Sequence, residues 1–123
     1  MKILIVDDSM AMRLIVKKTL RDAGYSGHTI VEAEDGEQGL SVVKTESPDL
    51  VMCDWNMPNM TGPELLEALN GEGITPKFGF VTTEATPEMR ARAEDLGARF
   101  LIAKPFTVQS FNEALDPFLS QHG

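Results

Sequence analysis

Cysteine is almost missing from this chain, because Cys53 is the only one among its 123 residues. One thiol cannot close an internal disulfide, so we expect a protein of a reducing compartment, the cytoplasm. Long hydrophobic runs are missing too, and none approaches the roughly 20 apolar residues that cross a bilayer. Asp7 and Asp8 interrupt the apolar N-terminal stretch after Ile3 to Val6, which a signal peptide does not tolerate. We therefore expect neither a membrane segment nor a signal for export.

Positive charge is scarce. Eleven Lys and Arg stand against 19 Asp and Glu, which gives a formal net charge of −8. A nucleic-acid-binding protein needs a cationic face to neutralise phosphates, and adsorption to anionic lipid needs one as well. The charge balance therefore argues against nucleic-acid and membrane partners. The length and the 42% hydrophobic content fit one globular domain over residues 1–123, with no second, output domain.

Short apolar runs alternate with helical patterns along the whole chain. The apolar runs predict strands near residues 3–6, 29–33, 50–53, 78–81 and 100–103. Helical spacing and end signals predict helices over about 10–23, 36–44, 63–70 and 87–96, and a last helix after Thr107. Strands that alternate with helices form a parallel sheet with right-handed crossovers. We therefore predict an α/β fold, a doubly wound five-stranded parallel sheet with five helices.

Local signals place several details. Ser9 is expected to cap the first helix, which Gly24 ends, and the apolar spacing predicts a buried stripe of Met12, Ile15, Val16, Thr19 and Leu20. Pro63 is expected at the first position of its helix. Gly79, inside a strand, indicates close approach of another group. Pro117 lies within the last helical pattern and predicts a kink or a break there.

Polar side chains stand at the ends of four of the predicted strands: Asp7, Asp8, Asp54, Thr82, Thr83 and Lys104. The carboxyl ends of parallel strands meet at one edge of the sheet, where ligands bind. Clustered carboxylates repel each other unless a cation offsets them, and such hard oxygen ligands suit Mg²⁺. Beside a metal, a carboxylate can attack phosphorus and form an aspartyl phosphate. Each residue alone has a simpler explanation as a helix cap, a strand end or a loop residue, but their coincidence at one edge favours a phosphoryl-transfer site.

Four motifs occur in order over almost the whole chain: Ile3-Leu4-Ile5-Val6-Asp7-Asp8-Ser9, Asp54-Trp55-Asn56-Met57-Pro58-Asn59-Met60, Val81-Thr82 and Lys104-Pro105-Phe106. In residue type, order and spacing they resemble the response-regulator receiver family of two-component signalling. The resemblance implies the strand order 2-1-3-4-5. It also implies a cis bond between Lys104 and Pro105.

The resemblance further implies a role for each site residue. Asp54 resembles the phosphoacceptor, which takes a phosphoryl group from the phosphohistidine of a sensor histidine kinase. Asp8, Asp54 and the backbone carbonyl of Asn56 would hold Mg²⁺ directly, and Asp7 would act through a bound water. Lys104 would contact the phosphoryl group.

Three more positions follow from the same resemblance. Thr82 would move toward the phosphoryl group as the switch residue, and the N–H of Thr83 would contact that group as well. Glu84 and Asn56 resemble the residues that flank the path of attacking water in chemotaxis-type receivers, which implies a short-lived phosphate. The downstream partner would bind the face formed by the fourth helix, the fifth strand and the fifth helix. The unphosphorylated protein would be a monomer.

Leu101 departs from the family pattern, because an aromatic residue, often tyrosine, is common three positions before the lysine. This departure leaves two outputs open: a chemotaxis-type switch, or a phosphorelay intermediate or phosphate sink. A second class is an enzyme, a Mg²⁺-dependent aspartyl phosphatase, but such enzymes place the nucleophile on the first strand with a second Asp two residues later. Here position 9 is Ser. The residues therefore favour a switch that assists its own phosphorylation and dephosphorylation and is not an enzyme acting on other substrates.

Overall fold

The computed structural model describes residues 1–119, in which five parallel strands alternate with five helices. The strands are β1 (Lys2–Val6), β2 (Thr29–Ala33), β3 (Leu50–Cys53), β4 (Lys77–Thr82) and β5 (Phe100–Ala103). They form one sheet in the order β2-β1-β3-β4-β5. In the register, Ile3 pairs with Ile30 on one side and with Leu50 on the other. The predicted α/β class and the strand order implied by the family resemblance are both confirmed.

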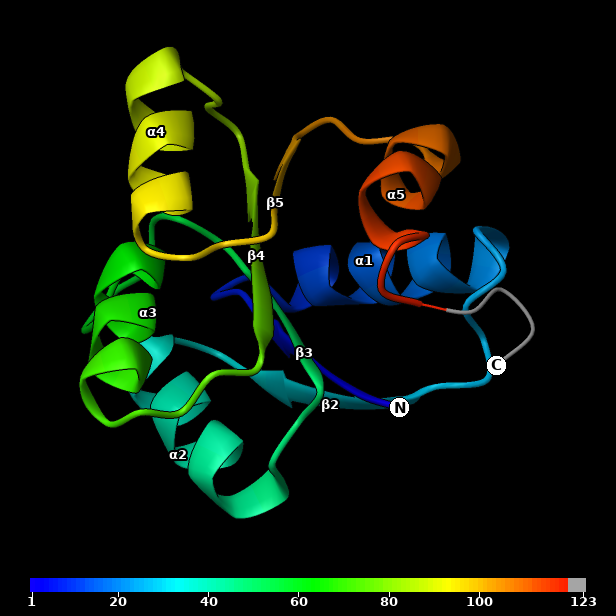
Figure 1. Ribbon diagram of the computed structural model, residues 1–123. Coiled ribbons are helices and arrows are strands. Elements are labelled where there is room, and N and C mark those ends of the chain that lie inside the picture. The colour runs from blue at the N-terminus through cyan, green and yellow to red at the C-terminus, as the bar shows by residue number, and fades with distance from the viewer. Residues whose placement is uncertain (120–123) are drawn as a thin grey trace.

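Helices cover both faces of this sheet. They are α1 (Met10–Asp22), α2 (Gly36–Glu46), α3 (Gly62–Gly71), α4 (Pro87–Asp95) and α5 (Val108–Leu115). Figure 1 shows α1 and α5 on one side of the strands and α2, α3 and α4 on the other. The sheet is therefore doubly wound, as predicted. No helix within residues 1–119 has the length and apolar character needed to span a bilayer.

The core has two halves, one on each face of the sheet. Side chains alternate along a strand, so Ile3 and Ile5 of β1 point to one face and Leu4 and Val6 to the other. Ile3 and Ile5 pack in the half that contains residues of α1 and α5, whereas Leu4 and Val6 pack in the half that contains residues of α2 and α3. All four are at most 1% exposed. Burial on both faces explains why this strand is apolar at every position instead of at alternate ones.

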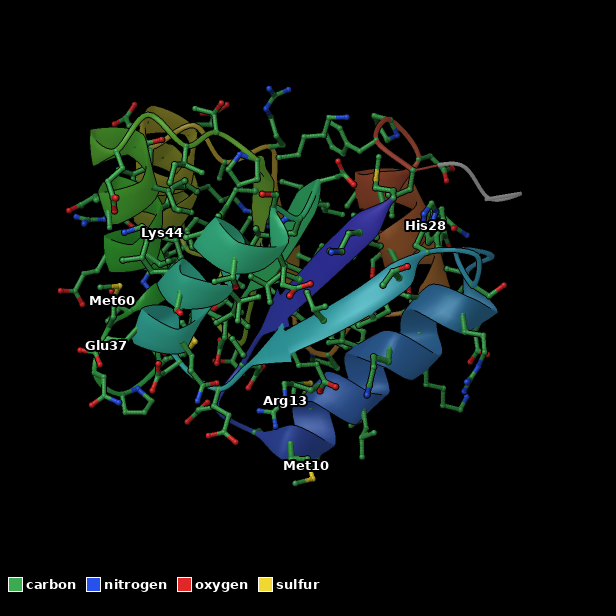
Figure 2. The ribbon with its side chains drawn as sticks, turned by 90° about the horizontal axis from the view of Figure 1, so that it is seen from below. Met10, Arg13, His28, Glu37, Lys44 and Met60 are labelled. Carbon is green, nitrogen blue, oxygen red and sulfur yellow. The ribbon has the colours of Figure 1, made fainter. Side chains whose placement is uncertain are left out.

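The ends of α1 agree with the prediction, and so do Val16 and Leu20 of its expected buried stripe, but Ile15 does not. The Ser9 hydroxyl accepts a hydrogen bond from the Met12 N–H, and Gly24 has a φ of +98° just after the helix. Ile15, expected in the core, is 47% exposed, whereas Arg13 is 6% exposed. The buried residues of α1 are Arg13, Val16 and Leu20. The side of the helix that faces the sheet is therefore rotated away from Ile15 and toward Arg13. Figure 2 shows Arg13 on the sheet side of α1 and Met10 on the outer side.

The start of α3 also differs from the prediction by one position. The helix begins at Gly62, which moves Pro63 to its second position. Thr61 is the cap, because its hydroxyl accepts from the Glu64 N–H while the Glu64 carboxylate accepts from the Thr61 N–H. A Cβ at Gly62 would lie 2.3 Å from the carbonyl oxygen of Asp54. A side chain is therefore excluded where the chain returns past Asp54.

The two remaining local predictions are confirmed. A Cβ at Gly79 would lie 2.1 Å from the ring of Phe100, its register partner on β5, which is the close approach expected at this glycine. The last helix, α5, ends at Leu115 with Asp116 as its cap, before Pro117. Proline cannot donate a backbone hydrogen bond, so the helix breaks there.

Candidate functional site

Three carboxylates converge at the carboxyl edge of the sheet. Asp7 follows β1 and Asp54 follows β3, two strands that are neighbours in the sheet, and Asp8 lies beside Asp7 in the chain. One ligand oxygen from each of the three lies within 4.8 Å of the others. Asp7 is buried at 4% exposure, Asp54 is half-buried and Asp8 is exposed. The cluster is therefore buried at Asp7 and open to solvent at Asp8.

Lys104 is the cation that pairs with the carboxylates of this cluster in the described part of the chain. Its Nζ lies 3.2 Å from Asp7 Oδ2 and 3.5 Å from Asp54 Oδ1, and its side chain is 10% exposed. The Lys104 N–H donates to the carbonyl oxygen of Thr82 at 2.7 Å, which fixes the residue after β5 against β4. The peptide bond between Lys104 and Pro105 is cis, as the resemblance implied.

The surroundings of Asp54 disfavour its charged form. Burial raises the pKa of the Asp54 carboxyl, Lys104 lowers it, and the neighbouring Asp7 charge raises it again. Three carboxylates against one ammonium leave a net negative site. A bound cation would relieve this imbalance.

The donor set fits a hard divalent cation. Carboxylate oxygens are the ligands that Mg²⁺ selects, and Mg²⁺ keeps several waters when a site offers only a few protein ligands. Asp7 is already oriented, because its Oδ1 accepts a hydrogen bond from the Ser9 N–H at 2.9 Å while its Oδ2 faces Lys104. Asp8 and Asp54 are the more accessible carboxylates of the three.

Thr82 lies at the same edge, as the last residue of β4. It is fully buried, and its hydroxyl accepts a hydrogen bond from the Glu84 N–H at 3.3 Å. Thr83 and Glu84 are exposed in the loop that follows, and Asn56 is exposed two residues after Asp54. The structure thus brings Asp7, Asp8, Asp54 and Lys104 into one cluster and places the other sequence-predicted residues around it.

Leu101 lies on β5 and not in the cluster itself. It is half-buried and packs against the core half beneath α2 and α3. Two hollows, of about 350 and 390 Å³, adjoin it, and Leu101 and Arg90 line both. One lies between α4 and β5, and the other extends from β5 to α5. The face made by α4, β5 and α5 therefore has a hollow on each side of Leu101.

Sequence reasoning missed Arg13. Its Nη1 donates to the backbone carbonyl of Asp7 at 2.6 Å, and its Nε donates to Glu32 Oε1 at 3.0 Å. Lys17 pairs with the other oxygen of Glu32 at 2.9 Å. Arg13 thereby ties α1 and β2 to the residue that begins the acidic cluster. The available signal was a charged residue one helical turn before Val16, on what proved to be the buried side.

Half-buried Trp55 lies beside the site and is the only tryptophan in the chain. Its backbone N–H donates to Asp54 Oδ1 at 2.8 Å, and its ring packs on Phe80 at 4.7 Å between centroids. Cys53 is fully buried in the core, and burial raises the pKa of its thiol well above the usual value. The thiol is therefore a core group and takes no part in the acidic cluster.

Comparison with known proteins gives a consistent result. The family model for the response regulator receiver domain matches residues 3–116. Chemotaxis protein CheY of Pseudomonas aeruginosa is 38% identical over 118 residues, covering 94% of each chain. Chemotaxis protein CheY-3 of Vibrio cholerae is 41% identical over 118 residues, covering 94% of this chain and 89% of that one.

A solved structure agrees with these relatives. Chemotaxis protein CheY4 of Vibrio cholerae superposes with a TM-score of 0.83 at 32% identity, covering 96% of this chain and 98% of that one. The fold, the strand order and the residues at the strand ends therefore lead to the same assignment as the comparisons. The chain belongs to the response regulator receiver domain family.

Proposed function

We propose that this response regulator accepts a phosphoryl group on Asp54 in the presence of Mg²⁺ and thereby switches its contacts with a partner protein in the cytoplasm. The observation that carries the proposal is the cluster of Asp7, Asp8 and Asp54 with Lys104 in contact with two of them. The half-buried Asp54 carboxylate is costly to keep charged, and metal binding relieves that cost. An acyl phosphate on Asp54 carries more negative charge than the carboxylate, so phosphorylation increases the need for the cation and for Lys104.

Phosphoryl transfer needs a nucleophile and charge neutralisation. An oxygen of Asp54 attacks phosphorus, the P–N bond of the donor phosphohistidine breaks, and the leaving imidazole keeps the electron pair and takes up a proton. Mg²⁺ held by Asp8, Asp54 and the carbonyl of Asn56 would neutralise the phosphoryl oxygens. Lys104 is close enough to Asp54, at 3.5 Å, to pair with a phosphoryl group on that carboxylate.

Thr82 is proposed as the switch residue. Its buried hydroxyl now accepts from the Glu84 N–H, and in our proposal it turns to donate to the phosphoryl group. The Glu84 N–H then loses its acceptor, so the loop between β4 and α4 rearranges. This loop adjoins the face of α4, β5 and α5, where Leu101 and Arg90 line the two hollows. We assign the downstream protein to that face.

Two outputs remain within this proposal. The names of the relatives and the pair Asn56 and Glu84, both exposed next to the site, support a chemotaxis-type switch with a short-lived phosphate. Leu101 supports a relay or phosphate sink, because it lacks the ring and hydroxyl that would report the state of Thr82. Family membership favours either output over a phosphatase that acts on other substrates.

The test is labelling with acetyl phosphate in Mg²⁺ and in EDTA, with wild type and Asp54→Asn, followed by decay after the donor is removed. We expect Mg²⁺-dependent labelling of wild type only. Fast decay supports the chemotaxis-type switch, whereas slow decay with transfer to a histidine phosphotransfer domain supports the relay. Equal labelling in EDTA, or of Asp54→Asn, would contradict the proposal.

A further inference from the structure

The loop that carries Asn56, residues 54–61 between β3 and α3, is attached to the start of α2. Asn59 Nδ2 donates to Asp35 Oδ2 at 2.9 Å. Asp35 is also the cap of α2, because its Oδ1 accepts from the Gln38 N–H at 2.8 Å. One carboxylate thus holds the first turn of a helix with one oxygen and the loop with the other. The hydrogen bonds from Gln38 and Asn59 also lower the pKa of Asp35, so this carboxyl is charged at neutral pH.

The backbone at Asn59, where the loop is attached, has an uncommon conformation. Asn59 has a φ of +67°, one of two positive values among the non-glycine residues described. The Met60 N–H donates across it to the Pro58 carbonyl at 2.7 Å, which closes a tight three-residue turn. Residues other than glycine rarely adopt a positive φ, and asparagine is among the few that tolerate it. The turn therefore persists because neighbouring contacts, the Asp35 bond among them, hold it.

The loop also packs closely against α2. A Cβ placed on Gly36 would lie 2.6 Å from the carbonyl oxygen of Met60 and 2.7 Å from its Cβ. Figure 2 shows Met60 and Glu37 in the same corner of the molecule, at the start of α2. The backbones of the loop and the helix are thus in direct contact beside the Asp35–Asn59 bond.

The loop has a second anchor, at the acidic cluster. The backbone N–H of Trp55 donates to Asp54 Oδ1 at 2.8 Å, and the Gly62 N–H donates to the backbone carbonyl of Trp55 at 2.9 Å. Asn56, whose carbonyl is assigned to Mg²⁺, lies between this anchor and Asn59. The conformation of Asn56 is therefore set from both sides, by Asp54 and by the Asp35–Asn59 pair.

We propose that Asp35 and Asn59 are positioning residues that hold the Asn56 carbonyl in place for the metal, although neither belongs to the acidic cluster. The inference rests on the proposed function, because it concerns the same Mg²⁺ site. Its test is a double-mutant cycle. Asn59→Asp places two acceptors opposite each other. Asp35→Asn keeps one hydrogen bond, because the Asn59 amide can turn its oxygen toward the new amide nitrogen at position 35. The double variant reverses donor and acceptor and restores one hydrogen bond.

All three variants keep a side-chain oxygen at position 35 for the Gln38 N–H, so the cap of α2 survives in each. Asn70→Asp is the matched control for added charge, since Asn70 bonds to the Leu96 carbonyl on a different part of the surface. The readout is the rise in melting temperature on addition of MgCl₂, which gives the Mg²⁺ affinity without phosphorylation. The melting temperature in EDTA separately reports any loss of stability. Measurement near 0.15 M salt limits the effect of added surface charge.

We expect Asn59→Asp to bind Mg²⁺ about fivefold more weakly, the factor that corresponds to the net free energy of one hydrogen bond, and Asp35→Asn to stay within about twofold of wild type. The double variant should return to within about twofold of wild type, and Asn70→Asp should not change the affinity. A merely structural role would lower the melting temperatures in EDTA and leave the Mg²⁺ increment unchanged, which would overturn the inference. A double variant that binds Mg²⁺ as weakly as Asn59→Asp would overturn it too. If wild type itself shows no Mg²⁺ increment, the proposed function fails, and this inference fails with it.

Discussion

Replacing Arg13 by methionine should destabilise the protein by about 1–3 kcal/mol. Methionine keeps most of the apolar volume on the sheet side of α1, so the loss comes from polar groups. The Asp7 carbonyl loses its bond from Arg13 Nη1, and leaving a buried acceptor unsatisfied costs about 1–3 kcal/mol. Glu32 adds only a few tenths of a kcal/mol, because its side chain is 35% exposed and keeps Lys17 as a partner.

Urea unfolding followed by circular dichroism measures this change, with an unaltered slope against denaturant as evidence that the native state stays compact. Lys18→Met is the matched control on the same helix. It removes a cation from an exposed pair with Asp22 at 2.8 Å and should change the stability far less. If Arg13→Met proved no more destabilising than Lys18→Met, the reasoning that Arg13 holds the backbone at Asp7 would be refuted.

Two further predictions concern the site and its loop. In EDTA, Asp54→Asn should be more stable than wild type at neutral pH. The raised pKa of Asp54 means that wild type loses stability as pH rises through that pKa and recovers it in acid, so the two should converge at low pH. Adding Mg²⁺ should raise the melting temperature of wild type more than that of Asp54→Asn, and the opposite order would exclude Asp54 as a ligand. Gly62→Ala should cost about 1–3 kcal/mol, because its Cβ would lie 2.3 Å from the Asp54 carbonyl oxygen. Gly71→Ala, with open space around its Cβ, should stabilise by about 0.5 kcal/mol, and equal effects at the two glycines would contradict the assigned contact.

Much of the fold was predictable from local signals. The strand patterns located every strand to within one residue at each end. The signal was clearest for β1 and β3, because strands buried on both faces leave unbroken apolar stretches, whereas β2 contains the exposed Glu32. The acidic cluster was predictable for a related reason. Asp7, Asp54 and Lys104 each follow an apolar strand, and parallel strands end at one edge of the sheet. The order of the strands came from the family resemblance and not from these patterns.

Other features depend on contacts that no local pattern contains. The stripe expected on α1 included Ile15, which is exposed, because apolar spacing alone does not tell which side faces the sheet when the buried side carries Arg13. Asp35 and Asn59 are 24 residues apart and meet only because α2 and the loop after β3 lie at the same edge. The Asp35–Asn59 pair was therefore beyond prediction from sequence.

The central claim, that Asp54 is the phosphoacceptor, is tested most directly by locating the phosphoryl group. Wild-type protein is incubated with acetyl phosphate and MgCl₂ and then treated with borohydride, which reduces an acyl phosphate to the alcohol. Peptide mass spectrometry then identifies the reduced residue. The account predicts a single reduced site at Asp54, lost when EDTA replaces MgCl₂. Reduction at Asp7 or Asp8 instead, or an unmodified Asp54 in protein that carries phosphate, would contradict it.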